Sequence, residues 1–478
     1  MVITRRQAQV NNNEAISSNG VTQNGYHDSK TISDDKMSPH WKNSWLSNFF
    51  HCTVWPFILI LGSSQGIMLL WYTAKKCDGS FSTLGGMFTT KGVLGVLVDI
   101  WSSVNICTKF SVLVLLSFFS FQLVLMRFLP GKTVYGPLTP NGHRPVYKDN
   151  GFYCYIVSVS ALFILQYFLK QYSLSVTIVY DRFEEFLATL SIFSGVFCIF
   201  LYIKGRVAPS PGEWEVTGNF IFDYFCGIEL YPRIFGFDVK VFTNCRFGMT
   251  VWPLLICIHA MKSYELYGFV DSMFVSATLQ MMYMTKFFWW ESGYMGTLDI
   301  MMDRAGYYIC WGCLVFIPGL YAITTFYLVS HPVRLGFGLS IAIFTVGSLA
   351  LVLNYWADWQ KQYVRAKNGD CLLWGKPPQM IKAKYHLKTG EVKESLLLAS
   401  GFWGVSRHFH YLPELLHAFC WCLPSMFQNI MAYTYFIWLL MLLVHRTYRD
   451  DLKCSVKYGE HWKEYKELVP YKIIPYVF

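Results

Sequence analysis

Apolar residues in this chain gather into runs of about 20 positions, with short polar segments between them. A run of this length crosses the hydrocarbon core of a bilayer as a helix, because lipid offers the backbone no hydrogen-bond partners and a helix satisfies its own. The runs that fit are residues 53–73, 105–126, 152–169, 186–203, 247–262, 269–290, 307–329 and 337–356. Each run predicts a transmembrane helix.

A longer apolar stretch covers residues 409–444, after a polar insert at 357–398. Pro413 and Pro424 interrupt this stretch, and a proline breaks or kinks a helix, so we expect two tightly turned or broken helices there. Together with the earlier runs, the pattern predicts an all-α, polytopic integral membrane protein with about ten transmembrane helices.

Basic residues predict the orientation of this bundle. An even number of helices places both termini on one side, and cytoplasmic segments are enriched in lysine and arginine. The basic segments are Arg5 with Arg6, the insert at 361–393 and the tail at 445–472. We therefore expect a disordered cytosolic tail over the polar residues 1–45 and a membrane domain over 46–478.

The composition agrees with this interpretation and limits the partners. Hydrophobic residues make up 54% of the chain and charged residues only 15%, which excludes an ordinary soluble protein. The net charge of +10 lies mostly in the loops, so it indicates topology and an anionic ligand, and no nucleic-acid partner is expected. The 14 cysteines are scattered, and the one CxxC, Cys310 with Cys313, lies in an apolar stretch that favours simple packing over a metal site.

Two stretches combine charged and aromatic residues within the apolar pattern. In GFWGVSRHFHYLPEL (401–415), Arg407, His408 and His410 place donors at membrane depth beside aromatic rings. Unpaired polar groups are costly there, which favours a functional site over an interfacial belt. TGNFIFDYFCGIELYPR (217–233) is equally consistent with a site and with a structural turn.

Two acids stand four residues apart in FFWWESGYMGTLDIMMDRAG (287–306). Asp299 and Asp303 share one face of a helix at this spacing. Two facing carboxylates can hold a metal or transfer a proton, but a solvated interfacial face explains them more simply.

The last apolar run ends in VHRTYRDDLKCSVKYG (444–459). Basic residues just past an apolar helix anchor it on the cytoplasmic side. A cationic pocket with a fixed acid and a tyrosine can also hold a phosphorylated cofactor. Composition alone leaves both interpretations open.

This stretch resembles the HRxxRDxxxCxxKYG signature of the sterol reductase family, and GNFIFDYFCGIELYPR (218–233) resembles a second signature that ends in Pro-Arg. Similarity in the same order extends over most of residues 215–478. The segments 368–381 and 400–411 resemble the branch of the family that acts on 7-dehydrocholesterol-like sterols. The resemblance implies an NADPH-dependent oxidoreductase of sterol biosynthesis, in the endoplasmic reticulum membrane, that saturates the C7–C8 double bond to give cholesterol.

The resemblance also implies where the ligands bind. The cofactor and the sterol are expected in residues 216–478, after the N-terminal helices of 46–215, with the lipid bilayer and other membrane enzymes of sterol biosynthesis as surroundings. The expected NADPH-binding residues are Lys361, Arg365, Leu398, Trp403, His410, Tyr411, Asp450, Cys454, Lys457, Tyr458 and Tyr465. The expected catalytic residues are Tyr283, Asp450 and Arg446, since a protein acid must protonate the alkene before NADPH delivers hydride to the carbocation.

Four positions depart from the family pattern: Tyr231, Lys286, His410 and Cys313. Lys286 replaces an intramembrane acid, and a buried lysine must find a partner or lose its proton. These departures leave two alternatives: a reductase of another sterol double bond, Δ14 or in the side chain, and a catalytically weak sterol-binding membrane protein. A transporter is a third, because intramembrane charges also mark ion paths.

Overall fold

The computed structural model describes residues 48–139, 142–386 and 390–478. The expected tail at 1–45, with Arg5 and Arg6, lies outside the described residues. Nine described helical segments are long and apolar enough to cross a membrane. They are Phe50–Lys76 (η4 and α2), Phe81–Ser102 (α3), Lys109–Phe128 (α4), Gly151–Lys170 (α5), Phe183–Val207 (α7), Val241–Tyr267 (η5 and α9), Tyr307–Ser330 (α13, η6 and α14), Phe337–Ala366 (α15) and Ile430–Tyr458 (η8 and α18). The prediction of a polytopic helical membrane protein is confirmed.

Shorter or less apolar elements connect these spans. The transmembrane helix expected at 269–290 is one of them, because polar residues such as Gln280 and Lys286 lower the hydropathy of α10 and it is not among the nine described candidate spans. The other helices are α6 (Ile178–Asp181), α8 (Phe220–Cys226), α10 (Asp271–Trp289), α11 (Glu291–Tyr294), α12 (Leu298–Met301), α16 (Phe402–Val405), α17 (Tyr411–Cys422), η7 (Leu423–Ser425) and α19 (Glu460–Leu468). The strands form three antiparallel two-stranded ladders: β1 (Lys132–Tyr135) with β2 (Val146–Asp149), β3 (Arg233–Ile234) with β4 (Phe237–Asp238), and β5 (Met380–His386) with β6 (Val392–Leu398). In the last ladder, Met380 pairs with Leu398 and His386 with Val392.

The helix α3 is a span that the hydropathy pattern did not predict. Four glycines, Lys91 and Asp99 dilute its apolar run, and Gly92 takes the left-handed φ of 69° that kinks the helix. Most of α3 faces outward, and Leu94 is 79% exposed. The low hydropathy and the glycines explain why the sequence did not predict this helix, which packs mainly on α2.

The apolar stretch at 409–444 forms broken helices, as predicted. The helix α17 has only 12 residues, too few to cross a bilayer, and ends where Pro424 begins a tight turn. Met426 and Phe427 take left-handed φ values of 51° and 56°, which reverse the chain. The next helix, α18, continues to Tyr458, so the basic tail expected from residue 445 is helical over its first part.

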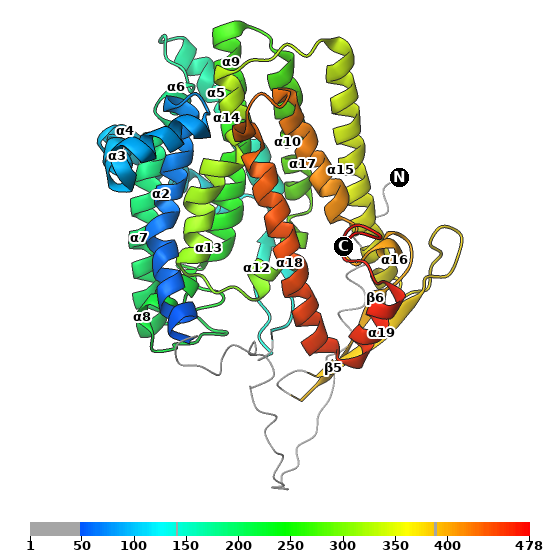
Figure 1. Cartoon of the computed structure of the whole chain (residues 1–478). Helices are drawn as coiled ribbons and strands as arrows, with labels where there is room; N and C mark the ends of the chain where they lie inside the picture. The colour runs from blue at the N-terminus through cyan, green and yellow to red at the C-terminus, as the bar shows by residue number, and fades with distance from the viewer. Residues whose placement is uncertain (1–47, 140–141, 387–389) are drawn as a thin grey trace.

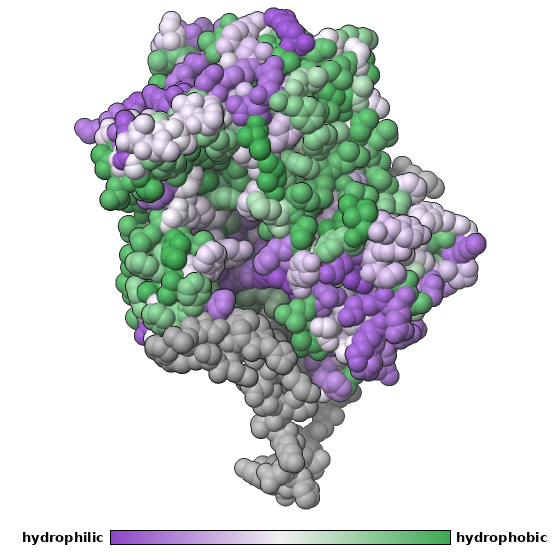
Figure 2. Space-filling view, in the orientation of Figure 1, coloured by the Kyte–Doolittle hydropathy of each residue, from purple (hydrophilic) through white to green (hydrophobic). Residues whose placement is uncertain are grey.

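The predicted insert at 357–398 also begins as helix. Its first ten residues complete α15, and the rest contains the β5–β6 ladder. The ladder, α19 and the last turns of α18 lie together at one end of the bundle (Figure 1). Figure 2 shows hydrophilic residues gathered over this end and an apolar surface along the helices.

Helices α9, α10 and the η6 segment form the centre of the bundle, together with α17 and α18. Trp252, Trp421 and Tyr435 are almost fully buried there. At Gly319 a Cβ atom would lie 2.6 Å from Ile67 and 3.5 Å from Leu187, so this glycine allows η6 to approach α2 and α7 closely. The packed centre fixes the positions of the polar residues described next.

Candidate active site

The end of α18 presents one stripe of polar side chains. Asp450, Cys454 and Tyr458 follow at intervals of four residues, so they share a face of the helix. Cys454 Sγ lies 3.8 Å from Asp450 Oδ2. The Tyr458 hydroxyl donates to Ser395 Oγ of β6 at 3.4 Å, and Lys457 lies 3.9 Å from the Tyr385 ring of β5. The face therefore points toward the β5–β6 ladder.

Two cations on α15 face the same region. Lys361 and Arg365 stand one helical turn apart, and the Lys361 ammonium lies 3.8 Å from the centre of the Trp403 ring. Within the described part of the chain, Lys361 forms no ion pair. Arg365 reaches the Leu396 carbonyl at 3.5 Å. The two side chains thus leave cationic groups available to an anionic ligand.

Hydrogen bonds to α15 hold Trp403 in place. Its indole N–H donates to the Ala357 carbonyl at 2.9 Å, and the Phe402 N–H donates to Gln360 Oε1 at 2.8 Å. Gly401 is required at this contact, because a Cβ atom there would lie 2.2 Å from the Gln360 oxygen. On the opposite side, the Tyr465 hydroxyl donates to the Leu398 carbonyl at 3.0 Å and fixes α19 on β6.

Aromatic rings line the wall between the cations and the membrane. His408 stacks on Tyr411 with ring centres 5.1 Å apart, and His410 lies 5.0 Å from Trp403. The backbone carbonyl of His410 accepts from Asn354 at 2.8 Å. The ring atom Nδ1 of His410 is buried and has no partner among the described residues. A flat ligand with polar groups at its rim fits such a wall.

The eleven expected cofactor residues therefore come together at one end of the bundle, from α15, β6, α16, α17, α18 and α19. Trp403, His408, His410 and Tyr411 of the stretch 401–415 join this cluster, whereas Arg407 does not. Arg407 instead donates to the Val469 and Pro470 carbonyls at 2.9 and 3.2 Å, so it holds the C-terminal segment.

His408 makes the stability of this wall depend on pH. Burial lowers the pKa of His408 to about 4, although the Asp450 carboxylate, 3.8 Å away, acts in the opposite direction. The side chain is neutral in the fold, whereas an unfolded histidine gains a proton below a pH of about 6.5. The free energy of unfolding should therefore fall by at most about 3 kcal/mol as the pH drops from about 6.5 to about 4.

Unfolding of the detergent-solubilised protein at several pH values measures this effect. The substitution His408→Gln should flatten the decline relative to the wild type over that range. An identical decline in both proteins would mean that other groups cause the acid sensitivity.

A second polar centre surrounds Arg446 and Arg449, which precede Asp450 in α18. Arg446 forms an ion pair with Asp299, and Arg449 forms one with Asp303 at 2.8 Å. Lys240 holds the loop that carries both acids, because its ammonium donates to the carbonyls of Asp299, Ile300 and Asp303 at 3.0, 2.7 and 2.7 Å. Burial lowers the pKa of Lys240 to about 8.

The two acids of 287–306 are thus partly buried members of ion pairs. The solvated face that was the simpler explanation is wrong, because the Asp299 and Asp303 side chains are only 22% and 17% exposed. No group of three or more His, Cys, Asp or Glu side chains in the described residues could hold a metal ion.

Tyr283 of α10 belongs to this second centre. Its hydroxyl donates to Glu414 Oε1 of α17 at 3.0 Å, and its ring lies among Trp252, Trp421 and His417. Asp450, which was expected beside Tyr283, instead lies with His408 and Cys454. Glu414 was missed by sequence reasoning, although it stands in the quoted stretch 401–415.

The stretch 217–233 serves as a structural turn. Asp223 is fully buried and accepts from the Thr217 N–H and hydroxyl at 3.1 and 2.7 Å. Glu229 pairs with Lys204 at 2.8 Å. Arg233 donates to the Val146 carbonyl at 2.6 Å. These partners satisfy all three charged residues, and none of them belongs to either polar centre.

The four departures from the family pattern occupy different places. Lys286 has found partners, as a buried lysine must: it donates to Asn354 and lies 3.8 Å from Asp358. Cys313 accepts from the Asn244 amide at 3.4 Å. Tyr231 belongs to a separate small core, with its ring 5.2 Å from the Lys240 ammonium. His410 alone lies in the cationic and aromatic cluster.

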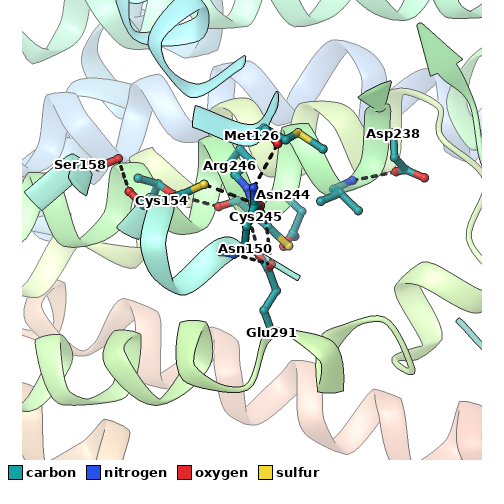
Figure 3. Close-up of polar contacts among 12 residues, drawn as sticks. Met126, Asn150, Cys154, Ser158, Asp238, Asn244, Cys245, Arg246 and Glu291 are labelled. Atoms are coloured by element: carbon teal, nitrogen blue, oxygen red, sulfur yellow. Dashed lines mark hydrogen bonds and ion pairs between the residues drawn. The ribbon is translucent and has the colours of Figure 1, made fainter. Parts of the chain in front are cut away.

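Sequence reasoning missed one fully buried ion pair. Arg246 of η5 pairs with Glu291 of α11, and both side chains are 0% exposed (Figure 3). Asn150 accepts from Arg246 at 2.9 Å, and Glu291 also accepts from the Gly151 N–H at 3.1 Å. The network joins the start of α5, η5 and the start of α11.

Comparison with known proteins identifies the relatives of this arrangement. The sequence matches the ergosterol biosynthesis ERG4/ERG24 family over residues 71–478. It is 48% identical to the 7-dehydrocholesterol reductase of Arabidopsis thaliana, over 86% of this chain and 94% of the relative. It is 33% identical to the 7-dehydrocholesterol reductase of Xenopus laevis, over 94% and 98%. It is 35% identical to the Delta(14)-sterol reductase of Methylotuvimicrobium alcaliphilum, over 79% and 86%. The predicted resemblance is therefore confirmed, and the chain belongs to the ERG4/ERG24 family of sterol reductases.

Proposed function

We propose that this protein is an NADPH-dependent sterol reductase that saturates the C7–C8 double bond of 7-dehydrocholesterol-like sterols to give cholesterol-like products. The observation that carries the proposal is the arrangement along α18: a cationic, aromatic cluster at Asp450–Tyr458 and a second polar centre at Arg446. The two relatives named 7-dehydrocholesterol reductase support the choice of substrate.

The cluster at the end of α18 fits NADPH. Lys361, Arg365 and Lys457 would neutralise its phosphates, and Trp403 and Tyr411 would hold its flat rings. The unpartnered His410 Nδ1 offers a polar contact at the rim of those rings. The remaining residues of the proposed site are Leu398, Asp450, Cys454, Tyr458 and Tyr465. The cofactor would supply the hydride.

The second centre would protonate the sterol. Tyr283 and Arg446 lie among the buried rings of α9, α17 and α18, an environment that keeps water from a carbocation. Arg446 supplies a fixed positive charge within electrostatic reach of Tyr283. Asp450 would serve both centres, because it lies one turn beyond Arg446 on the same helix. Residues 46–215 would then be a scaffold, and residues 216–478 would carry both sites.

The cellular setting follows from this function. A sterol substrate partitions into the bilayer, and the apolar sides of the helices place the catalytic centre at that depth. We expect the protein in the endoplasmic reticulum membrane, beside other membrane enzymes of sterol biosynthesis. The ladder β5–β6 and α19 would face the cytosol and its NADPH.

A second candidate is reduction of the C14–C15 double bond. The relative named Delta(14)-sterol reductase, at 35% identity, favours it. Purified protein given Δ5,7 and Δ8,14 dienes side by side would separate the two, with products identified by mass spectrometry. We expect saturation of the Δ5,7 diene only. Saturation of the Δ8,14 diene alone would overturn the assignment, and binding of both without reduction would favour a sterol-binding protein.

The substitution Lys361→Met should weaken NADPH binding roughly tenfold to a hundredfold, because it removes one charge-assisted contact to a phosphate. Lys367→Met is the matched control, since Lys367 is an exposed cation at the end of the same helix. Equilibrium binding of NADPH to the two variants measures the difference. Equal affinities would place the phosphates elsewhere.

A further inference from the structure

The hydrogen bond between Tyr283 and Glu414 joins α10 to α17 within the membrane domain. Tyr283 Oη lies 3.0 Å from Glu414 Oε1. Within the described residues Glu414 forms no ion pair, although three ion pairs surround this centre. The carboxyl group is thus the one acid near Tyr283 whose charge no cation directly neutralises.

The charged groups and the histidine that surround Tyr283 and Glu414 are held by other partners, so Glu414 is the group that can supply a proton to Tyr283. The groups that face this pair are Lys286 of α10, Tyr321 of η6, Asp358 of α15, Tyr411 and His417 of α17, and Tyr435 and Arg446 of α18. Lys286 is held by Asn354 and Asp358, and Arg446 is held by Asp299. Both ring nitrogens of His417 face backbone carbonyls, at 2.7 and 3.2 Å.

A phenol is a weak proton donor toward an alkene, and it is weaker still while its proton points at a carboxylate. A carboxylic acid is a much stronger acid than a phenol. A protonated Glu414 would donate to Tyr283 Oη and turn the phenol O–H away from itself. The same 3.0 Å contact then supports a relay of two protons.

We propose that Glu414 supplies the proton for sterol reduction and passes it through Tyr283. This inference rests on the proposed reductase function. Glu414 O–H gives its proton to Tyr283 Oη as Tyr283 O–H gives its own to one alkene carbon. The π electrons form the new C–H bond and leave a carbocation at the other carbon. Bound NADPH would supply the hydride that adds to the carbocation and would become NADP⁺. The Glu414 carboxylate then regains its proton from water. Glu414 acts through Tyr283 and is a positioning residue.

The substitution Glu414→Gln tests the relay, because an amide keeps a hydrogen bond to Tyr283 but has no acidic proton. We expect kcat to fall roughly a hundredfold with unchanged NADPH affinity. Glu414→Asp should restore part of the rate. Tyr283→Phe should cost as much as Glu414→Gln, and the double variant should cost no more, because the two residues act as one unit.

Two of these readouts separate proton supply from structure. Partial rescue by Glu414→Asp is one, because a merely structural loss would not be restored by the shorter acid. The non-additivity of the double variant is the other. The matched control is Glu265→Gln, at an exposed carboxylate that accepts from Ser175 and Thr177 at the far end of α9.

The outcomes distinguish this inference from the proposed function. Wild-type protein without turnover of any sterol diene would overturn the function. Normal wild-type turnover with Glu414→Gln within threefold of it would overturn the relay alone. The relay also fails if the double variant loses the product of both single effects.

Discussion

Replacing Arg446 by alanine should lower sterol turnover roughly a hundredfold to a thousandfold. The guanidinium is a fixed charge, 25% exposed, within electrostatic reach of Tyr283, Tyr411 and Glu414. When a proton leaves this centre, negative charge develops where the surroundings are apolar, and a preorganised cation stabilises it there far more than in water. Turnover per molecule of purified, folded protein measures the loss.

The partner of Arg446 complicates the single substitution, because Asp299 would remain as an uncompensated, partly buried charge. The double variant Arg446→Ala, Asp299→Asn removes both charges, so it should recover stability without recovering turnover. Lys463→Ala is the matched control, since Lys463 pairs with Glu460 on the exposed face of α19. If Arg446→Ala and Lys463→Ala both fail to accumulate in membranes, the basic residues serve as an anchor and the catalytic role is wrong.

Replacing Glu291 by alanine should lower the free energy of unfolding by about 3–5 kcal/mol. Arg246 would then be a buried charge without an acidic partner among the described residues, although it keeps its hydrogen bond to Asn150, and the Gly151 N–H would lose its acceptor. The network of Asn150, Arg246 and Glu291 (Figure 3) ties the start of α5, η5 and α11 together, so α11 should loosen as well. Denaturation in a fixed detergent, followed by tryptophan fluorescence, measures the change.

An exposed ion pair provides the comparison for Glu291. Lys91 and Asp99 of α3 pair at 2.5 Å with side chains 51% and 35% exposed, and Asp99→Ala should cost less than about 1 kcal/mol. Equal costs for Glu291→Ala and Asp99→Ala would show that burial does not govern these pairs.

The sequence predicts the membrane spans well where apolar runs are long and uninterrupted. It misses α3, whose glycines and charges lower its hydropathy although its surface faces outward. It also places the start of a tail at residue 445, whereas α18 continues to Tyr458. Polar residues after an apolar run are compatible with an irregular tail and with a continued helix. The packing of α18 against β5 favours the continued helix.

That the expected cofactor residues lie together could be predicted, because they stand in recognisable motifs. The second centre could not, because its contacts join distant parts of the chain: Tyr283 meets Glu414 and Arg446 meets Asp299. The spacing of Asp299 and Asp303 predicts a shared helical face, which is wrong because α12 ends at Met301 and Asp303 lies beyond it, and the spacing does not indicate the arginines that pair with them. Nothing near Arg246 in the sequence points to Glu291, 45 residues away, since a single buried charge carries no periodic signal.

The most direct test of the proposed function is NADPH consumption by detergent-purified protein with 7-dehydrocholesterol, with the sterol product identified by mass spectrometry. The arrangement of the two centres along α18 predicts stoichiometric conversion to cholesterol, with one NADPH oxidised per sterol. Recovery of unchanged 7-dehydrocholesterol, with no sterol-dependent NADPH oxidation, would contradict the assignment.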